Sequence, residues 1–118
     1  MKPDLSVVVP LFNEEPNLLD LHRELSKVLT AWGRPYEIIL VDDGSTDGTF
    51  SVLADIQSRD STVRVIRLRK NFGQTAAFAA GFAHARGTLI ATSDGDLQND
   101  PADLPAMVDK IDEGYDIV

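Results

Sequence analysis

Short apolar runs alternate with helical periodicities along this chain, and this alternation constrains its fold more than any other feature. The runs occupy residues 5–9, 36–41, 63–68 and 88–92. Between them, apolar residues recur at helical spacing. The order strand, helix, strand, helix predicts an α/β fold in which helices cover both faces of a mostly parallel, Rossmann-like sheet, a three-layer α/β/α arrangement joined by right-handed crossovers.

The punctuating residues predict where these elements begin and end. We expect Pro10 to stop the first strand and Pro16 to open the first helix, which Gly33 ends. Further helices are predicted over 49–59, with Phe50 facing inward, and over 74–86, with Gly81 as a packing glycine. The pattern continues with a helix over 101–113 and a strand over 115–118.

Composition narrows the classes of protein to which this chain can belong. Its 118 residues suffice for one domain with a core, and its net charge of −8 argues against a nucleic-acid surface. The absence of cysteine excludes disulfides and thiolate metal sites. We see no signal peptide and no apolar run near the ~20 residues that cross a bilayer. The sequence therefore predicts a cytoplasmic domain.

Polar segments directly follow all four strands, whereas the strand starts carry no comparable signal. In an open parallel sheet these segments lie at the carboxyl ends, where ligands bind at a reversal of strand order. The segments are residues 10–14, 42–45, 69–73 and 94–98.

The last segment carries two carboxylates, Asp94 and Asp96, followed by the amide of Gln98. Oxygen ligands suit hard cations such as Mg²⁺ and Mn²⁺, which keep positions free for water and phosphates. A solvated turn that caps the next helix is the alternative, and Asp100 fits that role. An EF-hand is excluded, because its turn glycine and its bidentate glutamate are both missing.

A second acidic pair, Asp42 and Asp43, follows the second strand. Adjacent carboxylates repel each other, so we expect one of them to accept hydrogen bonds from a ligand, such as a base N–H or ribose hydroxyls. A simple turn with a helix cap is the alternative, and it accounts for the residues that follow the pair: Gly44, Ser45, Asp47 and Gly48.

The loop after the first strand places Phe12 beside Asn13 and Glu14. An aromatic ring next to an amide and a carboxylate can stack on a base and hold it, although a loop that merely enters a helix has the same composition. Arg69 and Lys70 suit a diphosphate or a plain cationic surface. We assign no chemistry to the two histidines, His22 and His84.

Other classes of nucleotide and Mg²⁺ proteins fit less well. The chain has neither a G-x-G-x-x-G nor a P-loop motif. A receiver-like signalling domain would carry its acidic pair after the first strand. A nucleotidyltransferase would carry a Gly-rich basic loop there, and it stays the nearer alternative together with a non-catalytic nucleotide- or Mg²⁺-binding module.

Taken together, four motifs resemble glycosyltransferase family 2, and most closely its polyprenyl-phosphate branch, the dolichyl-phosphate mannose synthase-like enzymes. They are residues 9–14 (VPLFNE), 41–47 (VDDGSTD), 69–73 (RKNFG) and 93–98 (SDGDLQ). The resemblance spans the whole chain. It implies a GT-A fold, a UDP- or GDP-sugar donor, a divalent metal, Mg or Mn, and transfer with inversion onto a lipid phosphate acceptor.

The resemblance also implies roles for single residues. Pro10, Phe12 and Glu14, with Asn13 and Val41, would line the nucleoside. Asp43, with Asp42, would hold the base. Asp94 and Gly95 would lie at the ribose and diphosphate, and Gly95 stands where alanine is common in this branch. Asp96 and Gln98 would bind the metal, with Asp94 beside them, so Asp94 and Asp96 are the predicted catalytic residues.

Members of this family carry their acceptor-side residues, and often membrane helices, beyond the part that matches this chain. We therefore expect residues 1–118 to be the donor-binding part of a longer protein that works at the cytoplasmic face of a membrane. Alone, the chain should bind nucleotide or metal with little transfer activity. An unpaired sheet edge would allow chains to associate as homo-oligomers.

Overall fold

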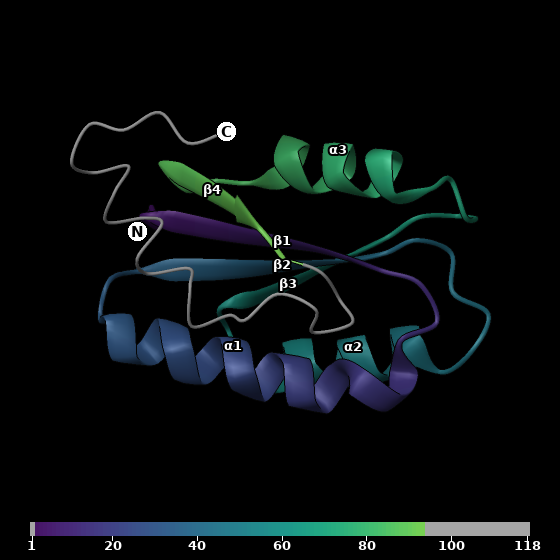
Figure 1. Cartoon of the computed structure of the whole chain (residues 1–118), viewed down its shortest axis with the longest axis horizontal. Coiled ribbons are helices and arrows are strands. Elements are labelled where there is room, and N and C mark those ends of the chain that lie inside the picture. The colour runs from purple at the N-terminus through teal and green to yellow at the C-terminus, as the bar shows by residue number, and fades with distance from the viewer. Residues whose placement is uncertain (1, 94–118) are drawn as a thin grey trace.

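The computed structural model describes residues 2–93, which form a three-layer α/β/α unit (Figure 1). The elements, in chain order, are β1 (Leu5–Leu11), the 3-10 turn η1 (Glu15–Asn17), α1 (Leu18–Trp32), β2 (Tyr36–Asp42), α2 (Thr49–Arg59), β3 (Val63–Arg67), α3 (Gln74–His84) and β4 (Leu89–Thr92). The predicted helix over 101–113 and the predicted strand over 115–118 lie outside the described residues.

The sheet has the order β3-β2-β1-β4, and every described strand pair is parallel. β1 pairs with β2 along its whole length, from Leu5 opposite Tyr36 to Leu11 opposite Asp42. β4 pairs with β1 over four residues only, ending with Val8 opposite Thr92. The chain thus adds β2 and β3 on one side of β1 and then crosses to the other side. This reversal, between β1 and β4, is where open α/β sheets bind ligands.

Helices α1 and α2 cover one face of the sheet and α3 covers the other (Figure 1). Four leucines of α1 recur at helical spacing and are fully buried against alternate residues of the strands, such as Val7, Val9 and Leu40: Leu18, Leu21, Leu25 and Leu29. Gly33 ends α1 in a left-handed conformation, with φ of 81°, as the sequence predicted. Among residues 2–93, no helix has the length and apolar character needed to span a membrane.

The opposite face has a smaller core beneath α3, in which Ala77 is fully buried with Val8, Ile39 and Val41. Gly81 packs directly on the sheet, because a Cβ at this position would overlap a methyl group of Val8. The predicted role of Gly81 as a packing glycine is confirmed. Small residues therefore let α3 lie close to β1 and β2.

The prediction that Pro10 stops the first strand is wrong, since β1 continues to Leu11. Along β1, the carbonyl of Val8 accepts from Ser93 on the β4 side, and that of Leu11 accepts from Asp43 on the β2 side. The backbone N–H and C=O groups of successive residues point to opposite sides of a strand. The nitrogen of Pro10, two residues after Val8, therefore faces the β4 side, where pairing has already ended at Val8. The missing N–H of Pro10 therefore breaks no described strand bond.

Other boundaries shift by a few residues. Pro16 lies in the 3-10 turn, and α1 begins after it, at Leu18. Phe50, predicted to face inward, is half-buried, and the guanidinium of Arg67 lies 4.2 Å from the centre of its ring. The third helix ends at His84, and the Arg86 amide, within the predicted helix, donates to the Glu37 carboxylate instead.

Candidate functional site

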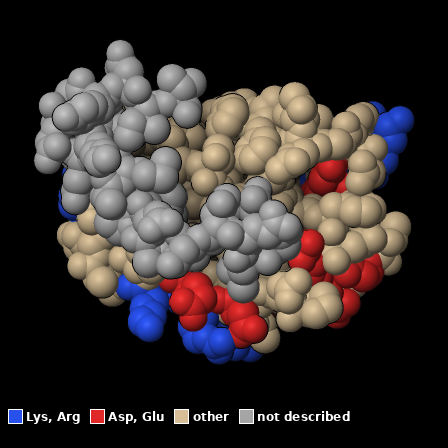
Figure 2. Space-filling model, viewed as in Figure 1, with Lys and Arg blue, Asp and Glu red and all other residues tan. Residues whose placement is uncertain are grey.

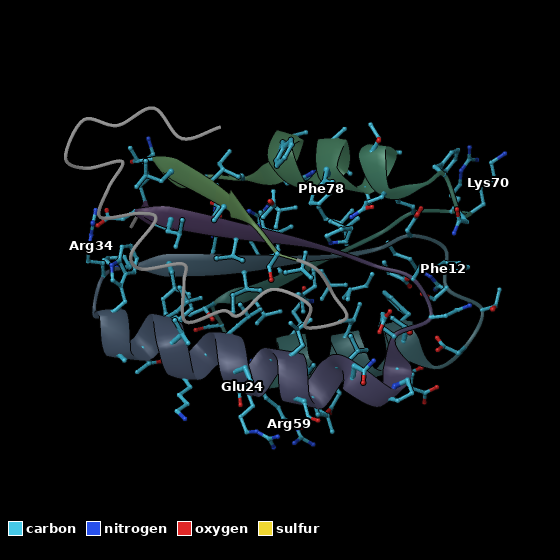
Figure 3. All side chains as sticks on the ribbon, in the orientation of Figure 1. Phe12, Glu24, Arg34, Arg59, Lys70 and Phe78 are labelled. Atoms are coloured by element: carbon cyan, nitrogen blue, oxygen red, sulfur yellow. The ribbon has the colours of Figure 1, made fainter. Side chains whose placement is uncertain are left out.

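The loops that follow β1, β2 and β3 meet at the carboxyl edge of the sheet. Figure 3 places Phe12 and Lys70, from the first and third of these loops, at the same end of the molecule, with Arg34 at the opposite end. Figure 2 shows acidic side chains at this end, with basic side chains at its rim. The predicted convergence of the strand-end loops is thus present for the three loops that the structure describes.

Asp42 and Asp43 direct their carboxylates to different loops. The Oδ1 atom of Asp42 accepts a hydrogen bond from the Ser45 amide at 3.0 Å, which closes the turn that leads to α2. The carboxylate of Asp43 accepts from the amides of Phe72 and Gly73, at 2.9 and 3.0 Å, where the chain enters α3. Both side chains are buried, and the Oδ2 atom of Asp42 has no partner among residues 2–93.

The turn after Asp43 and the loop before α3 touch backbone to backbone. Gly44 has φ of +71°, and a Cβ there would overlap the backbone of Lys70 and Asn71. Only glycine fits both the conformation and the space. Together with the Asp43 carboxylate, this contact holds residues 69–73 in one place relative to β2.

Asn13 joins the first loop to the second. Its backbone is left-handed, with φ of 53°, a conformation that asparagine tolerates better than most residues. The side-chain Oδ1 atom of Asn13 accepts from the Thr46 amide at 2.8 Å. The backbone N–H of Asn13 donates to the Ser45 hydroxyl at 2.9 Å. The Glu14 amide donates to the Thr49 hydroxyl at 3.0 Å, and Glu15 accepts from the Gly48 amide at 2.9 Å. The loops after β1 and β2 are therefore joined by several hydrogen bonds.

The predicted turn over residues 44–48 is confirmed. The Asp47 carboxylate accepts from both the hydroxyl and the amide of Thr49, the first residue of α2. The hydroxyl bond is the main reason that the pKa of Asp47 lies below its usual range. Asp47 is thus explained by the start of α2 without any ligand.

Two aromatic rings remain open at this edge. Phe12 is 42% exposed and Phe72 is 50% exposed, which is unusual for phenylalanine. The ammonium of Lys70 lies 5.2 Å from the centre of the Phe72 ring. The Glu14 carboxylate accepts from the Asn17 side chain at 2.9 Å, which fixes it beside Phe12 at the start of η1. Exposed rings with fixed polar neighbours can stack on a planar ligand.

Four of the predicted site residues, Asp94, Gly95, Asp96 and Gln98, lie outside the described residues. The described chain ends at Ser93, whose amide donates to the Val8 carbonyl at 3.1 Å, beside β1 at the reversal of strand order. Among residues 2–93, no group of three acidic or histidine side chains is placed to hold a metal ion.

Sequence reasoning missed that Asn13 and Asp43 brace the loops. An Asp-x-x-Ser turn signal was available for Asp42, but the bonds of Asp43 and Asn13 span about thirty residues and leave no local pattern. Gly44, directly after the two aspartates, was the one sequence sign of close packing, but it does not indicate which loop packs there.

Residues 6–118 match the family model described as Glycosyl transferase family 2. Over 115 residues the chain is 44% identical to undecaprenyl-phosphate 4-deoxy-4-formamido-L-arabinose transferase of Klebsiella pneumoniae (strain 342). That match covers 97% of this chain and 35% of the relative, so the chain spans about a third of the length of that protein.

Solved structures share the architecture. The 1–349 form of S. aureus TarS in complex with UDP-GlcNAc matches with a TM-score of 0.72 at 26% identity, over 96% of this chain and 32% of that form. The complex of the same form with UDP matches with a TM-score of 0.71 at 27% identity, over 96% of this chain and 32% of that form. Mannosyltransferase PcManGT from Pyrobaculum calidifontis, in complex with GDP-Man and Mn²⁺, gives 0.69 at 24% identity, over 81% of this chain and 28% of that one.

The likeness to PcManGT concerns the fold alone, which is the GT-A fold of these glycosyltransferases. The family match carries more weight, because it covers nearly the whole chain, including all four strand-end motifs. This chain belongs to glycosyl transferase family 2.

Proposed function

We propose that this chain is the donor-binding part of an inverting glycosyltransferase that moves a sugar from a nucleoside-diphosphate sugar to a polyprenyl phosphate. The observation that carries the proposal is the carboxyl edge of the sheet, where three braced loops meet at the reversal of strand order. The name of the K. pneumoniae relative supports the lipid phosphate, and the TarS complexes support a nucleotide sugar.

The nucleoside would lie against the loops after β1 and β2. The exposed ring of Phe12 offers a stacking surface, and Pro10 and Val41 pair with each other near the ends of β1 and β2. Asn13 and Glu14 hold the loop that carries Phe12. The predicted nucleotide-binding residues are therefore best divided between those that touch the ligand and those that shape the loop.

Asp43 can serve both purposes. A carboxylate has about four acceptor positions, and the amides of Phe72 and Gly73 occupy one on each oxygen. A base N–H can be accepted without releasing the loop. Asp43 is 4% exposed, so the loss of water around such a bond would make it selective.

The predicted metal ligands are Asp94, Asp96 and Gln98, a set of oxygen donors that fits Mg²⁺ or Mn²⁺. A divalent cation bound there supplies charge neutralisation for a leaving diphosphate. Asp94 and Gly95 would contribute to the ribose and diphosphate contacts. In the sequence, these four residues come shortly after β4, which ends at Thr92.

In the proposed reaction, an oxygen of the acceptor phosphate attacks the anomeric carbon of the donor. The bond from that carbon to the diphosphate oxygen breaks, and the configuration inverts. Because a phosphate acceptor is already ionised near neutral pH, no strong general base is needed. The acceptor-side residues, attachment to the cytoplasmic face of a membrane and any homo-oligomer remain predictions for the longer protein.

Calorimetric titration of the 118-residue chain with UDP and GDP, with and without Mn²⁺, tests this proposal. We expect one nucleotide to bind, with an affinity that rises when Mn²⁺ is present, and little sugar transfer to a lipid phosphate by the isolated chain. ATP and CTP are the matched controls. Absence of binding by both UDP and GDP would contradict the proposal, and full turnover would contradict the assignment of acceptor residues to the longer protein.

A further inference from the structure

A second carboxylate network lies at the amino ends of the strands, at the opposite edge of the sheet from the candidate site. At its centre is Glu37, the second residue of β2, which is 2% exposed and pairs in register with the fully buried Ser6. Its Oε2 atom accepts from the Ser6 hydroxyl at 2.6 Å and from the Arg86 amide at 2.7 Å. Its Oε1 atom accepts from the guanidinium groups of Arg64 and Arg86, at 3.1 and 3.0 Å.

The network fastens the connection between α3 and β4 to the rest of the sheet. The Gly87 amide donates to the Ser6 hydroxyl at 2.8 Å, and Arg64 donates to the His84 carbonyl at 2.7 Å. A Cβ on Gly87 would lie 2.6 Å from the Ser6 nitrogen, so the connection runs directly against β1. Residues 84–87 are thus tied to β1, β2 and β3 before β4 begins.

The side chains of β4 specify its register only weakly. Leu89 and Ala91 are partly buried against the larger core, while Ile90, opposite Ser6, is 45% exposed. A shift by one residue turns every side chain to the other face, which would bring Ile90 to the core side. Since Ile90 is as apolar as Leu89, burial alone discriminates little between the two registers.

We propose that Glu37 is a positioning residue, which fixes the register of β4 against β1 and thereby places the β4 end of the donor site. Selecting one register is the best-attested role of buried ionic groups. A slip of one residue would move Ser93 by about 3.3 Å along β1. The consequence for donor binding rests on the proposed function, whereas the register itself does not.

The chain has no cysteine, so pairs of introduced cysteines report the register without background. Val7→Cys with Ala91→Cys reports the observed pairing, and Val7→Cys with Ile90→Cys or Thr92→Cys reports the two slipped pairings. We expect only the first pair to cross-link in the parent chain. Adding Glu37→Gln should produce cross-links in a slipped pair, whereas an unchanged pattern would overturn the proposal.

Asp60→Asn is the matched control, because Asp60 also accepts several hydrogen bonds, from Thr62 and His22, but lies away from β4. It should lower stability and leave the cross-linking pattern intact. If Glu37→Gln does not fold, Ser6→Ala carries the test, since it keeps both ion pairs and removes only the hydroxyl that joins Glu37 to Gly87. An unchanged pattern in Ser6→Ala would then overturn the proposal.

Nucleotide titration separates this proposal from the proposed function. We expect Glu37→Gln to weaken Mn²⁺-dependent nucleotide binding by about tenfold, because small misplacements of a site are costly. Asp60→Asn should leave that affinity unchanged. If the parent chain binds no nucleotide, the proposed function fails while the cross-linking result still decides the role of Glu37. If Glu37→Gln shifts the register but not the affinity, the positioning role is overturned.

Discussion

The amino and carboxyl edges of this sheet both hold buried carboxylates, but the hydrogen-bond donors around these carboxylates differ. At the amino edge, Glu37 is surrounded by two guanidinium groups, a hydroxyl and an amide. At the carboxyl edge, Asp43 is held by two backbone amides and no cation is bonded to it among the described residues. The first arrangement consumes the acceptor capacity of its carboxylate, and the second leaves positions for a ligand. The comparison separates a structural network from a candidate binding site.

Acid should weaken the amino edge, and this is the largest effect that we expect. Burial alone would raise the pKa of Glu37, but the hydrogen bonds from Ser6, Arg86 and Arg64 outweigh it and lower the pKa from 4.5 to about 2. A lowered folded-state pKa stabilises the protein above pH 4.5. That contribution, on the order of 3 kcal/mol, is lost as the pH falls from 4.5 through 2.

Urea unfolding at a series of pH values measures this loss. Asp47 and Asp60 also have lowered pKa values and act in the same direction, so the informative quantity is the difference between the parent chain and Glu37→Gln. We expect the variant to lose less stability between pH 5 and pH 2.5 than the parent chain does. Parallel pH curves would show that Glu37 has no such role.

At the carboxyl edge, Asp43→Asn should have an intermediate effect. An asparagine can accept with one atom only, so either the Phe72 or the Gly73 amide loses its partner, at a cost of about 1–3 kcal/mol. Hydrogen exchange at these two amides should accelerate more than exchange in α1. Asp55→Asn, on the exposed side of α2, is the control, and equal exchange in both variants would argue against the anchoring role.

The smallest effect concerns Asn13. Asn13→Gly keeps the left-handed backbone and removes only the bonds of Oδ1, which should cost about 1 kcal/mol. Asn13→Ala removes the same bonds and adds strain at φ of 53°, a further penalty of about 1 kcal/mol. Thermal or urea unfolding of the pair measures the difference. Equal stabilities would mean that the left-handed conformation at Asn13 is not strained.

The sequence predicted the meeting of the loops at the carboxyl edge, because that feature follows from the periodicity of the strands and helices. Alternating strands and helices imply parallel strands, and parallel strands bring their carboxyl ends to one edge, so the loops with Phe12 and Asp43 were expected together. The strand through Pro10 was not expected, because it depends on how far β4 pairs with β1.

The amino edge gave almost no signal in the sequence. Glu37 stands within an apolar run, and its partners Arg64 and Arg86 lie 27 and 49 residues away. Such long-range charge pairing has no period and no motif. The same holds for the bond that the Phe72 amide donates to Asp43, so the sequence singled out Asp43 and not the loop that it anchors.

Nuclear magnetic resonance of the ¹⁵N-labelled chain tests the central claim most directly, because it locates binding at one edge or the other. Titration with UDP or GDP in the presence of Mg²⁺ should shift the amides of residues 12–14, 42–45 and 70–73, and replacement by Mn²⁺ should broaden signals near the carboxyl end of β4. The amides of Glu37, Arg86 and Gly87 should stay unchanged. Shifts confined to those three amino-edge residues, with the carboxyl-edge loops unaffected, would contradict the account.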